Sequence, residues 1–261
     1  MRARQSVVAC LLVVLLSAGC TSVIAGDPRP ATGLKPRPLI GPTIMQGLLD
    51  DAALSKILNQ SFTAKSALPS RFGGPETLQQ AFGLVSPVDC AGVTTMMEKS
   101  AYQFGQVKNV ARETWWNAGG PARVISVAEG VVALSTAAEA TALFEKFSQQ
   151  WDRCDGTTVT IERPSIIIDR AGTTLSGKIS DVHVANSVLA ATVLVDTRLP
   201  GSPPSGPRPV ARAVGVRGNC LVEVDVAFFG ARSPSDQGSG DVTTSAVEIA
   251  HAMMDKVSAL S

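Results

Sequence analysis

The chain has 261 residues, of which 23 are Lys or Arg and 22 are Asp or Glu, so its formal net charge is +1. A chain of this length can build one well-buried core, or at most two small ones once its N-terminal segment is set apart. Because the charges are balanced and form no basic stripe along the sequence, nucleic acid is excluded as a partner.

The N-terminus has the three parts of a secretory signal peptide. Arg2 and Arg4 precede an apolar run over residues 7–16, and the small residues 17–19 lead to Cys20. A membrane-spanning helix needs about 20 apolar residues, so this run is too short to span a bilayer. A basic start, a short apolar run and small residues at its exit predict a signal peptide over residues 1–19.

Residues 16–20 resemble a bacterial lipobox, in which the cysteine is acylated on sulfur and becomes the new N-terminus. The usual pattern has an aliphatic residue three positions before the cysteine, where this chain has Ser17, with Leu16 one position earlier. We expect Cys20 to carry lipid, including palmitate, and to anchor an extracytoplasmic protein to the cell membrane. The alternative is an ordinary signal peptide that merely ends near a cysteine.

Residues 20–42 are interpreted as a lipidated N-terminus and a tether. This segment contains Pro28, Pro30, Pro36, Pro38 and Pro42 and has no aromatic residue. Such a composition buries too little apolar area to fold, and the prolines keep the chain extended. The folded domain is therefore expected over residues 43–261, where no stretch is long and apolar enough to span a bilayer.

Helices are predicted at both ends of this domain and at one place inside it. The capping and apolar patterns indicate helices over residues 47–62, 75–82, 86–104, 135–154 and 243–260. The clearest is 135–154, where Thr136 and Glu139 have the spacing of a capping box. Its apolar stripe consists of Ala140, Leu143, Phe144, Phe147 and Trp151.

Strands fill the remaining chain. Period-two alternation and turn residues predict strands over residues 107–117, 122–134, 157–162, 165–170, 175–186, 188–197, 209–218 and 220–229. Runs of consecutive strands with segregated helices favour an α+β fold with a largely antiparallel sheet and helices packed on it.

Three cysteines remain once Cys10 leaves with the signal peptide and Cys20 is lipidated. Cys220 shares a strand face with Val222 and Val224, so it points into the core as a small hydrophobe. Cys90 and Cys154 lie at the ends of predicted segments, and such loop or helix-end positions suit a disulfide in an exported protein. A metal site is the weaker alternative, because neither histidine lies near a cysteine in the sequence.

No enzyme motif is present, and no cofactor, metal site or catalytic residue is expected. The sequence lacks a nucleophile elbow, a zinc-protease motif, a P-loop and a dinucleotide fingerprint. His183 shares a strand face with Asp181. The two residues form either part of a solvated polar face or a dyad of the kind that hydrolases use. His251 is expected on the surface of the last helix. Glu223 and Asp225 form either a carboxylate pair for acid–base chemistry or the wet side of an amphipathic strand.

The adjacent tryptophans Trp115 and Trp116 offer the one lead to a ligand contact. Neighbouring residues on a strand point to opposite faces, so both cannot enter the same core. One is expected to pack inside, and the other to lie under a helix or in a cleft that suits an apolar or sugar ligand.

Four segments together resemble a known family. They are residues 89–93 (DCAGV), 111–117 (ARETWWN), 143–156 (LFEKFSQQWDRCDG) and 211–226 (ARAVGVRGNCLVEVDV). Their order and spacing resemble the PknH-like extracellular sensor domain, and the resemblance covers residues 48–259. This family occurs outside the membrane on actinobacterial receptor Ser/Thr kinases and on free-standing lipoproteins.

The resemblance implies a twisted antiparallel sheet with helices packed on it, a cleft for an unknown ligand, and a disulfide between Cys90 and Cys154. We therefore expect a cell-envelope lipoprotein whose sensor-like domain binds a small or lipid-like ligand. The alternatives are an envelope protein–protein interaction module and, less favoured, a hydrolase. Because this chain contains no kinase domain, signalling would require another envelope or signalling protein as a partner.

Overall fold

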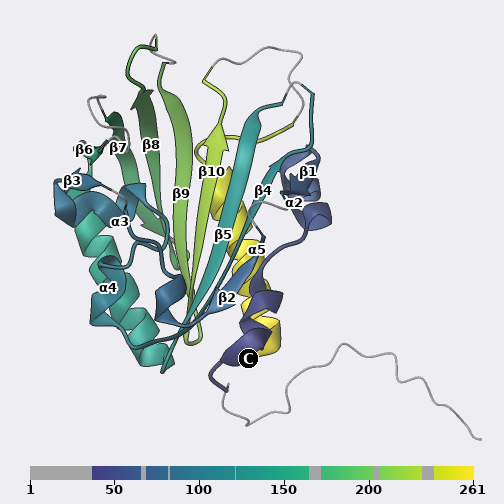
Figure 1. Cartoon of the computed structure of the whole chain (residues 1–261). Coiled ribbons are helices and arrows are strands. Elements are labelled where there is room, and N and C mark those ends of the chain that lie inside the picture. The colour runs from purple at the N-terminus through teal and green to yellow at the C-terminus, as the bar shows by residue number, and fades with distance from the viewer. Residues whose placement is uncertain are drawn as a thin grey trace, which may run out of the picture. The chain divides into compact units, whose positions relative to one another are not determined.

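Ten antiparallel strands form one sheet in the order β1-β4-β5-β10-β9-β8-β7-β6-β3, with β2 also paired to β4 (Figure 1). The strands are β1 (Phe62–Ala64), β2 (Arg71–Gly73), β3 (Leu84–Ser86), β4 (Val107–Asn117), β5 (Val124–Leu134), β6 (Thr158–Arg163), β7 (Thr173–Ala185), β8 (Val188–Arg198), β9 (Arg208–Arg217) and β10 (Cys220–Phe228). Helices pack on this sheet, which confirms the expected α+β class and its antiparallel character.

The computed structural model describes residues 37–65, 69–81, 83–120, 122–164, 172–202, 206–230 and 238–261. The predicted signal peptide, Cys20, most of the predicted tether and the strand predicted at 165–170 lie outside these residues. Among the described residues, no helix combines the length and apolar character needed to cross a membrane.

One sheet face, called the α5 face, is covered by η1 (Gly41–Gly47), α2 (Asp51–Leu58) and α5 (Ser245–Leu260). Cys220 is fully buried on this face and has no disulfide partner, as expected from its alternation with Val222 and Val224. Leu39 is also buried, and its N–H donates to Oδ1 of Asn219 at 2.7 Å. The folded domain therefore includes residues ahead of the expected boundary at residue 43.

The opposite face, called the α4 face, is covered in part by α4 (Ala137–Cys154). The predicted cap is present, because the Thr136 hydroxyl accepts the N–H of Glu139 at 3.1 Å. Every residue of the predicted apolar stripe is buried: Ala140, Leu143, Phe144, Phe147 and Trp151. This helix was predicted correctly because its cap and its 3.6-residue period both lie within the segment.

The helix predicted over residues 86–104 is wrong. The chain there forms η3 (Val88–Cys90), α3 (Ala91–Thr94) and η4 (Ala101–Phe104), with a link of turns between the last two. Met97 in this link has a positive φ of 54°. The helix predicted over 75–82 is also wrong, since only η2 (Pro75–Thr77) forms before the chain becomes irregular.

A buried ion pair explains why the segment 86–104 departs from a helix. Nη2 of Arg212 on β9 lies 2.9 Å from Oε2 of Glu223 on β10, and both side chains are almost fully buried. Arg212 also donates to the carbonyls of Val93 (3.0 Å) and Gly92 (3.3 Å). A continuous helix would direct those carbonyls into its own hydrogen bonds, so the break supplies the acceptors that a buried guanidinium needs.

Glu223 receives the matching donors. The backbone N–H of Met97 donates to Oε2 at 3.0 Å, and the Tyr102 hydroxyl donates to Oε1 at 2.5 Å. The interpretation of Glu223 as the wet side of an amphipathic strand is therefore wrong, because α4 and the segment 88–104 cover this face as well. Both faces of β10 are therefore buried. Val222 and Val224 lie on the apolar face, and Glu223 lies on the other face, where Arg212 pairs with its charge.

We expect Arg212→Met to lower the free energy of unfolding by about 3–5 kcal/mol, because it leaves the Glu223 carboxylate buried without its cation. Urea denaturation measures this loss. The matched control is Arg217→Met on the same strand, where the side chain is exposed. Replacing both members of the pair (Arg212→Met with Glu223→Leu) should cost less than Arg212→Met alone; equal losses in Arg212→Met and Arg217→Met would contradict the role of the pair.

Candidate functional site

The α4 face has an uncovered end, which forms a cleft of ≈ 530 Å³ that we call the Trp116 cleft. One wall comes from β2 and β4 and carries Arg71, Arg112 and Trp116. Across the cleft, β6 and β7 contribute an apolar and basic wall, consisting of Ile161, Arg163 and Leu175. The irregular chain at 94–96 lines it as well. Its size falls within the range of small-ligand sites.

Small side chains line the strands between these two walls. Trp116 pairs across the sheet with Ser126, Ser126 with Ala227, and Ala227 with Val210, so one row crosses four strands. Ala128, one pair further along β5, also lines the cleft. A row of short side chains leaves a hollow that larger residues would fill. Its surface is mixed, with slightly more apolar than polar area.

The structure separates the roles of the two tryptophans. Trp115 packs against the core of the α5 face, and its Nε1 donates to Oε1 of Glu129 at 3.0 Å. Trp116 points to the other face and lines the cleft, with the Lys65 ammonium 3.9 Å from its ring centroid. Trp116 Nε1 is buried, and among the described residues no group accepts its hydrogen. Buried donors are nearly always paired, so this N–H needs an acceptor that the described residues do not supply.

Arginines on neighbouring strands give the cleft wall its charge. Arg71 lies directly opposite Arg112 in the β2–β4 pairing. Burial, and secondarily the Arg71 charge, lower the pKa of Arg112. In the part of the chain that the structure describes, neither guanidinium forms an ion pair.

Asp225 is one of two described acidic residues that line the cleft. It is half-buried on β10 and lines the cleft beside Ala227. Desolvation raises the pKa of Asp225, the Arg212 charge lowers it, and the Glu223 charge raises it again. Glu113 also lines the cleft, but its strand position matches that of Trp115 on the opposite face.

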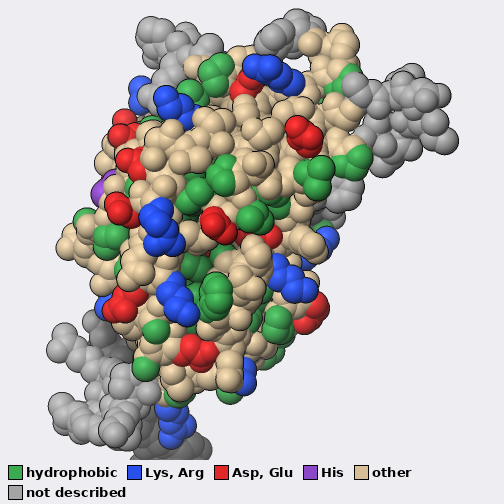
Figure 2. Space-filling model, turned by 90° about the vertical axis from the view of Figure 1, so that its left-hand side faces the viewer, with side chains coloured by type: hydrophobic (Ala, Val, Ile, Leu, Met, Phe, Trp, Pro, Cys, Tyr) green, Lys and Arg blue, Asp and Glu red, His purple; other side chains and the backbone are tan. Residues whose placement is uncertain are grey.

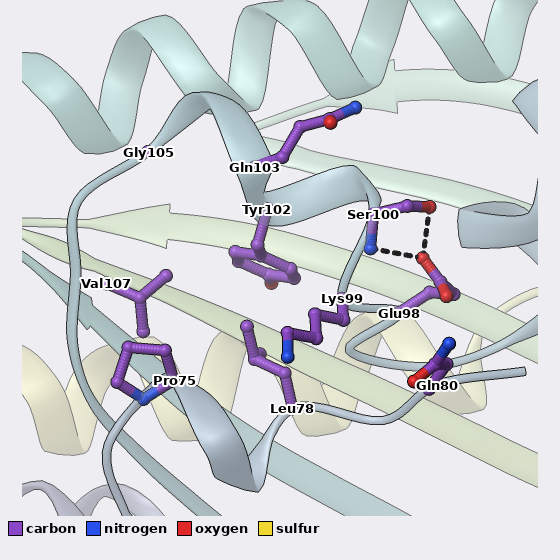
Figure 3. A pocket seen from close by; sticks show the side chains of 10 residues that line it. All are labelled: Pro75, Leu78, Gln80, Glu98, Lys99, Ser100, Tyr102, Gln103, Gly105 and Val107. Atoms are coloured by element: carbon purple, nitrogen blue, oxygen red, sulfur yellow. Dashed lines mark hydrogen bonds between the residues drawn. The ribbon is translucent and has the colours of Figure 1, made fainter.

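A second hollow of ≈ 470 Å³ lies between η2, η4 and the start of β4 (Figure 3). Pro75, Leu78 and Val107 surround it with the ring of Tyr102, and Lys99 extends toward it from the chain before η4. The Tyr102 hydroxyl is already committed to Glu223. This apolar hollow could not be predicted from the sequence, because the segments that form it were expected to be helical.

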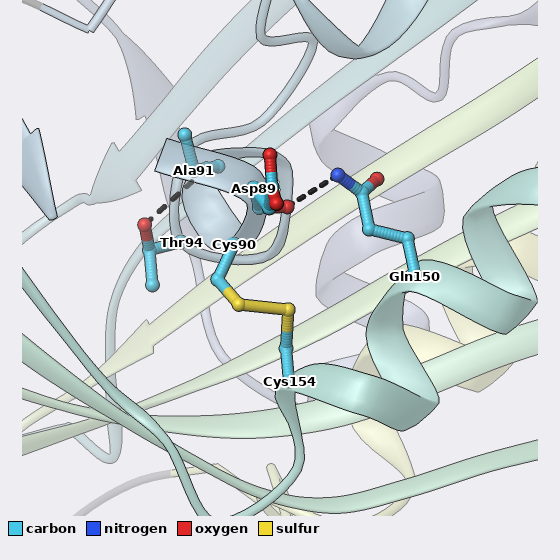
Figure 4. The surroundings of a disulfide bond; sticks show 6 residues. All are labelled: Asp89, Cys90, Ala91, Thr94, Gln150 and Cys154. Carbon is cyan, nitrogen blue, oxygen red and sulfur yellow. Dashed lines mark hydrogen bonds between the residues drawn. A yellow bond between two sulfur atoms is a disulfide. The ribbon is translucent and has the colours of Figure 1, made fainter. Parts of the chain in front are cut away.

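Cys90 and Cys154 form the disulfide that their positions suit and that the resemblance implies (Figure 4). Their Cα atoms are 5.8 Å apart, and the bond joins the end of η3 to the end of α4. Beside it, Nε2 of Gln150 donates to the carbonyl of Asp89. The covering segment is thus tied to α4 here and to the sheet at Arg212.

The histidines are not placed as catalytic groups. His183 is exposed, and its Nδ1 lies 2.8 Å from the backbone carbonyl of Asp181 rather than from its carboxylate. That carboxylate accepts the Ser180 hydroxyl at 3.0 Å. His251 is half-buried on α5, away from the residues that line the cleft. Within the described ranges, no cluster of His, Cys, Asp or Glu could hold a metal ion.

The structure is an α+β domain in which helices pack on both faces of one antiparallel sheet, and one end of the α4 face remains open as a cleft. A family model described as the PknH-like extracellular domain matches residues 42–256, and the chain therefore belongs to this family of extracellular, sensor-type domains. The family assignment from the four sequence segments is confirmed. No curated protein sequence matches the chain.

Two solved structures are similar to the chain. The extracellular domain of PknH from Mycobacterium tuberculosis matches with a TM-score of 0.63 and 18% identity, over 85% of this chain and 98% of that one. This likeness shows the shared fold. An uncharacterized protein from Mycobacterium smegmatis matches with a TM-score of 0.38 and 12% identity, over 83% of this chain and 96% of that one.

Sequence reasoning found Trp116 but missed the arginines beside it. Arg112 precedes Trp116 by an even number of residues on the same strand, so strand alternation alone places both on one face. Arg71 carried no such signal, because β2 has only three residues and was not predicted.

Glu129 behind Trp115 should make stability depend on pH. Burial raises its pKa to about 8, although the Leu49 N–H and Trp115 Nε1 donate to it. The folded state therefore keeps a proton that the unfolded chain, with an ordinary pKa near 4.3, releases. The contribution of Glu129 to stability should be greatest below about pH 4 and fall as the pH rises toward 8, by at most about 1.4 kcal/mol per pH unit.

Urea denaturation between pH 5 and 8.5 measures this slope. Glu129→Gln should flatten it, whereas Glu145→Gln, at an exposed position of α4, should leave it unchanged. A wild-type slope that persists in Glu129→Gln would contradict the assignment to Glu129.

Proposed function

We propose that the protein is a cell-envelope lipoprotein whose sensor-type domain binds a small or lipid-like ligand in the Trp116 cleft. The observation that carries this proposal is Trp116, whose buried Nε1 has no acceptor among the described residues while its side chain lines an open hollow. A ligand with an acceptor atom would accept a hydrogen bond from that donor and bury the apolar surface of the hollow.

The lipid anchor is the second part of the proposal. Its support is the short apolar run, the small residues before Cys20 and the proline-rich segment that follows. Membership of an extracellular domain family agrees with export. The matched domain is of the sensor type, so signalling would also require an effector domain or protein beyond it.

A protein-interaction module is the alternative that a specific observation favours. Val88 and Phe104 are 63% and 64% exposed and border the same shallow hollow beside α4. Leu84 on the neighbouring edge strand β3 is 76% exposed. These side chains lie away from the Trp116 cleft, so the two functions can be tested separately.

Cys20→Ala should abolish membrane association. The parent protein, expressed with its own N-terminus in an actinobacterial host, should partition with membranes and carry the added mass of a diacyl group at Cys20. The variant should lack that mass and appear in the soluble fraction. Cys220→Ala is the matched control, since its thiol is buried in the domain. Unchanged partitioning of Cys20→Ala would refute the anchor.

A cleft ligand should raise the melting temperature in proportion to RT ln(1 + [L]/Kd). We expect at least one fraction from a screen of envelope lipids and glycans to do so and to change tryptophan fluorescence. Trp116→Ala should weaken that binding about tenfold or more, as loss of a buried aromatic contact does.

Phe104→Ala removes an aromatic side chain outside the cleft and serves as the matched control. If no fraction changes the melting temperature, or if Phe104→Ala weakens binding as much as Trp116→Ala, the cleft is not the ligand site. The interaction module would then account better for the surface.

A further inference from the structure

The paired arginines on the cleft wall are set apart by their direct opposition across two strands. Between described residues, ion pairs form at Arg212 and at Arg198. Arg212 has its carboxylate, and Arg198 has Asp196 at 3.4 Å. On the face shown in Figure 2, the described acidic and basic side chains are interspersed. Arg71 and Arg112 instead face each other across one strand pair, and no described carboxylate forms an ion pair with either.

This arrangement costs stability in the empty protein. Directly opposed residues of antiparallel strands have Cβ atoms about 4.5–5.5 Å apart, and like charges at that separation repel. Arg112 is half-buried, so water screens it less than it screens the exposed Arg71. An anion bound between the guanidinium groups would remove this repulsion and accept several charge-assisted hydrogen bonds.

The nearby carboxylates do not occupy this position. Asp225 is on β10, two strands from β4, which is about 10 Å at the usual strand spacing. Glu223 lies in the same cross-strand row as Arg112, with Gly130 between them. The Met97 side chain covers that glycine so closely that a Cβ there would meet its sulfur at 2.3 Å. Met97 therefore stands between Arg112 and the buried ion pair.

The same wall continues into an apolar surface. Arg112, Thr114 and Trp116 lie on one face of β4, and the short side chains of the cleft extend from them toward Ile161 and Leu175. The Trp116 ring also has the Lys65 ammonium over one face. A ligand that follows this wall meets cations and the Trp116 edge first, and then a hollow of short apolar side chains that also contains Asp225.

We infer that the Trp116 cleft takes an amphiphile with a phosphate monoester head, which Arg71 and Arg112 hold while its apolar part lies along Ala128, Ala227 and Val210. The inference rests on the proposed ligand-binding function and adds the chemical class of the ligand. Two guanidinium groups match the charge of a phosphate monoester, and their planar donors match its oxygens.

Octyl phosphate is the test ligand, used below its micelle concentration and measured by calorimetry and tryptophan fluorescence. Octyl glucoside has the same tail with a neutral head, and inorganic phosphate has the head without a tail. We expect octyl phosphate to bind at least about tenfold more tightly than either, because each lacks one half of the recognition.

Arg71→Gln and Arg112→Gln should each weaken octyl phosphate binding about tenfold and leave octyl glucoside unaffected. Arg217→Gln, at an exposed position at the far end of β9, is the matched control and should bind like the parent. Without ligand, Arg71→Gln should melt no lower than the parent, since it removes a repulsion. This last measurement shows that lost binding is not lost folding.

The outcomes separate the two proposals. Equal binding of octyl phosphate and octyl glucoside, or unchanged binding in both arginine variants, would overturn the phosphate head while leaving the cleft as a ligand site. Inorganic phosphate that binds as tightly as octyl phosphate would overturn the amphiphile. If neither octyl compound binds, the inferred ligand class is wrong, and the lipid and glycan screen decides the proposed function on its own.

Discussion

The buried ion pair between Arg212 and Glu223 is the constraint on which the α4 face depends. Two charges on adjacent strands cannot be buried without partners for their remaining hydrogen-bonding groups. The chain supplies them from one segment: the carbonyls of Gly92 and Val93 for the guanidinium, and the Met97 N–H with the Tyr102 hydroxyl for the carboxylate. A segment that must offer both carbonyls and an N–H to the sheet cannot remain a helix.

The ion pair also determines how far the segment 88–104 covers the α4 face. The segment is held over the middle of β9 and β10 by the ion pair, and at its start by the bond from Cys90 to Cys154. Residues 94–96 then line the cleft, and beyond them the short side chains of Ser126, Ala128 and Ala227 on β5 and β10 are left uncovered. The same side chains thus close one half of the face and leave the other half open.

The sequence predicts the elements whose signals lie within them. Thr136, Glu139 and the apolar stripe define α4, and the long strands show their period over ten or more residues. The sequence pattern does not predict the conformation of the segment 86–104, because that conformation depends on hydrogen bonds to Arg212 and Glu223, more than a hundred residues later in the chain. Local helix propensity favoured one helix there, and the desolvation cost of a distant ion pair prevailed.

The same distinction holds for the candidate site. Alternation requires Trp115 and Trp116 to face opposite ways, and the sequence could state that without saying which one meets the cleft. The choice follows from Glu129, which accepts the Trp115 N–H on the α5 face and leaves Trp116 for the other side. Arg71 enters the site only through β2, whose pairing with β4 is a tertiary contact of three residues.

The parts of the chain that line the cleft are held unequally. The segment 88–104, whose residues 94–96 line the cleft, is fixed by a disulfide and a buried ion pair, both of which resist displacement. The β2 wall is held by a short strand pair that also opposes two cations. An anion between Arg71 and Arg112 would convert that repulsion into a cross-link, so ligand binding and attachment of β2 would stabilise each other. The shape of the cleft then depends on the buried charges beside it, and under the proposal its preference for a ligand would depend on the two opposed arginines at its rim.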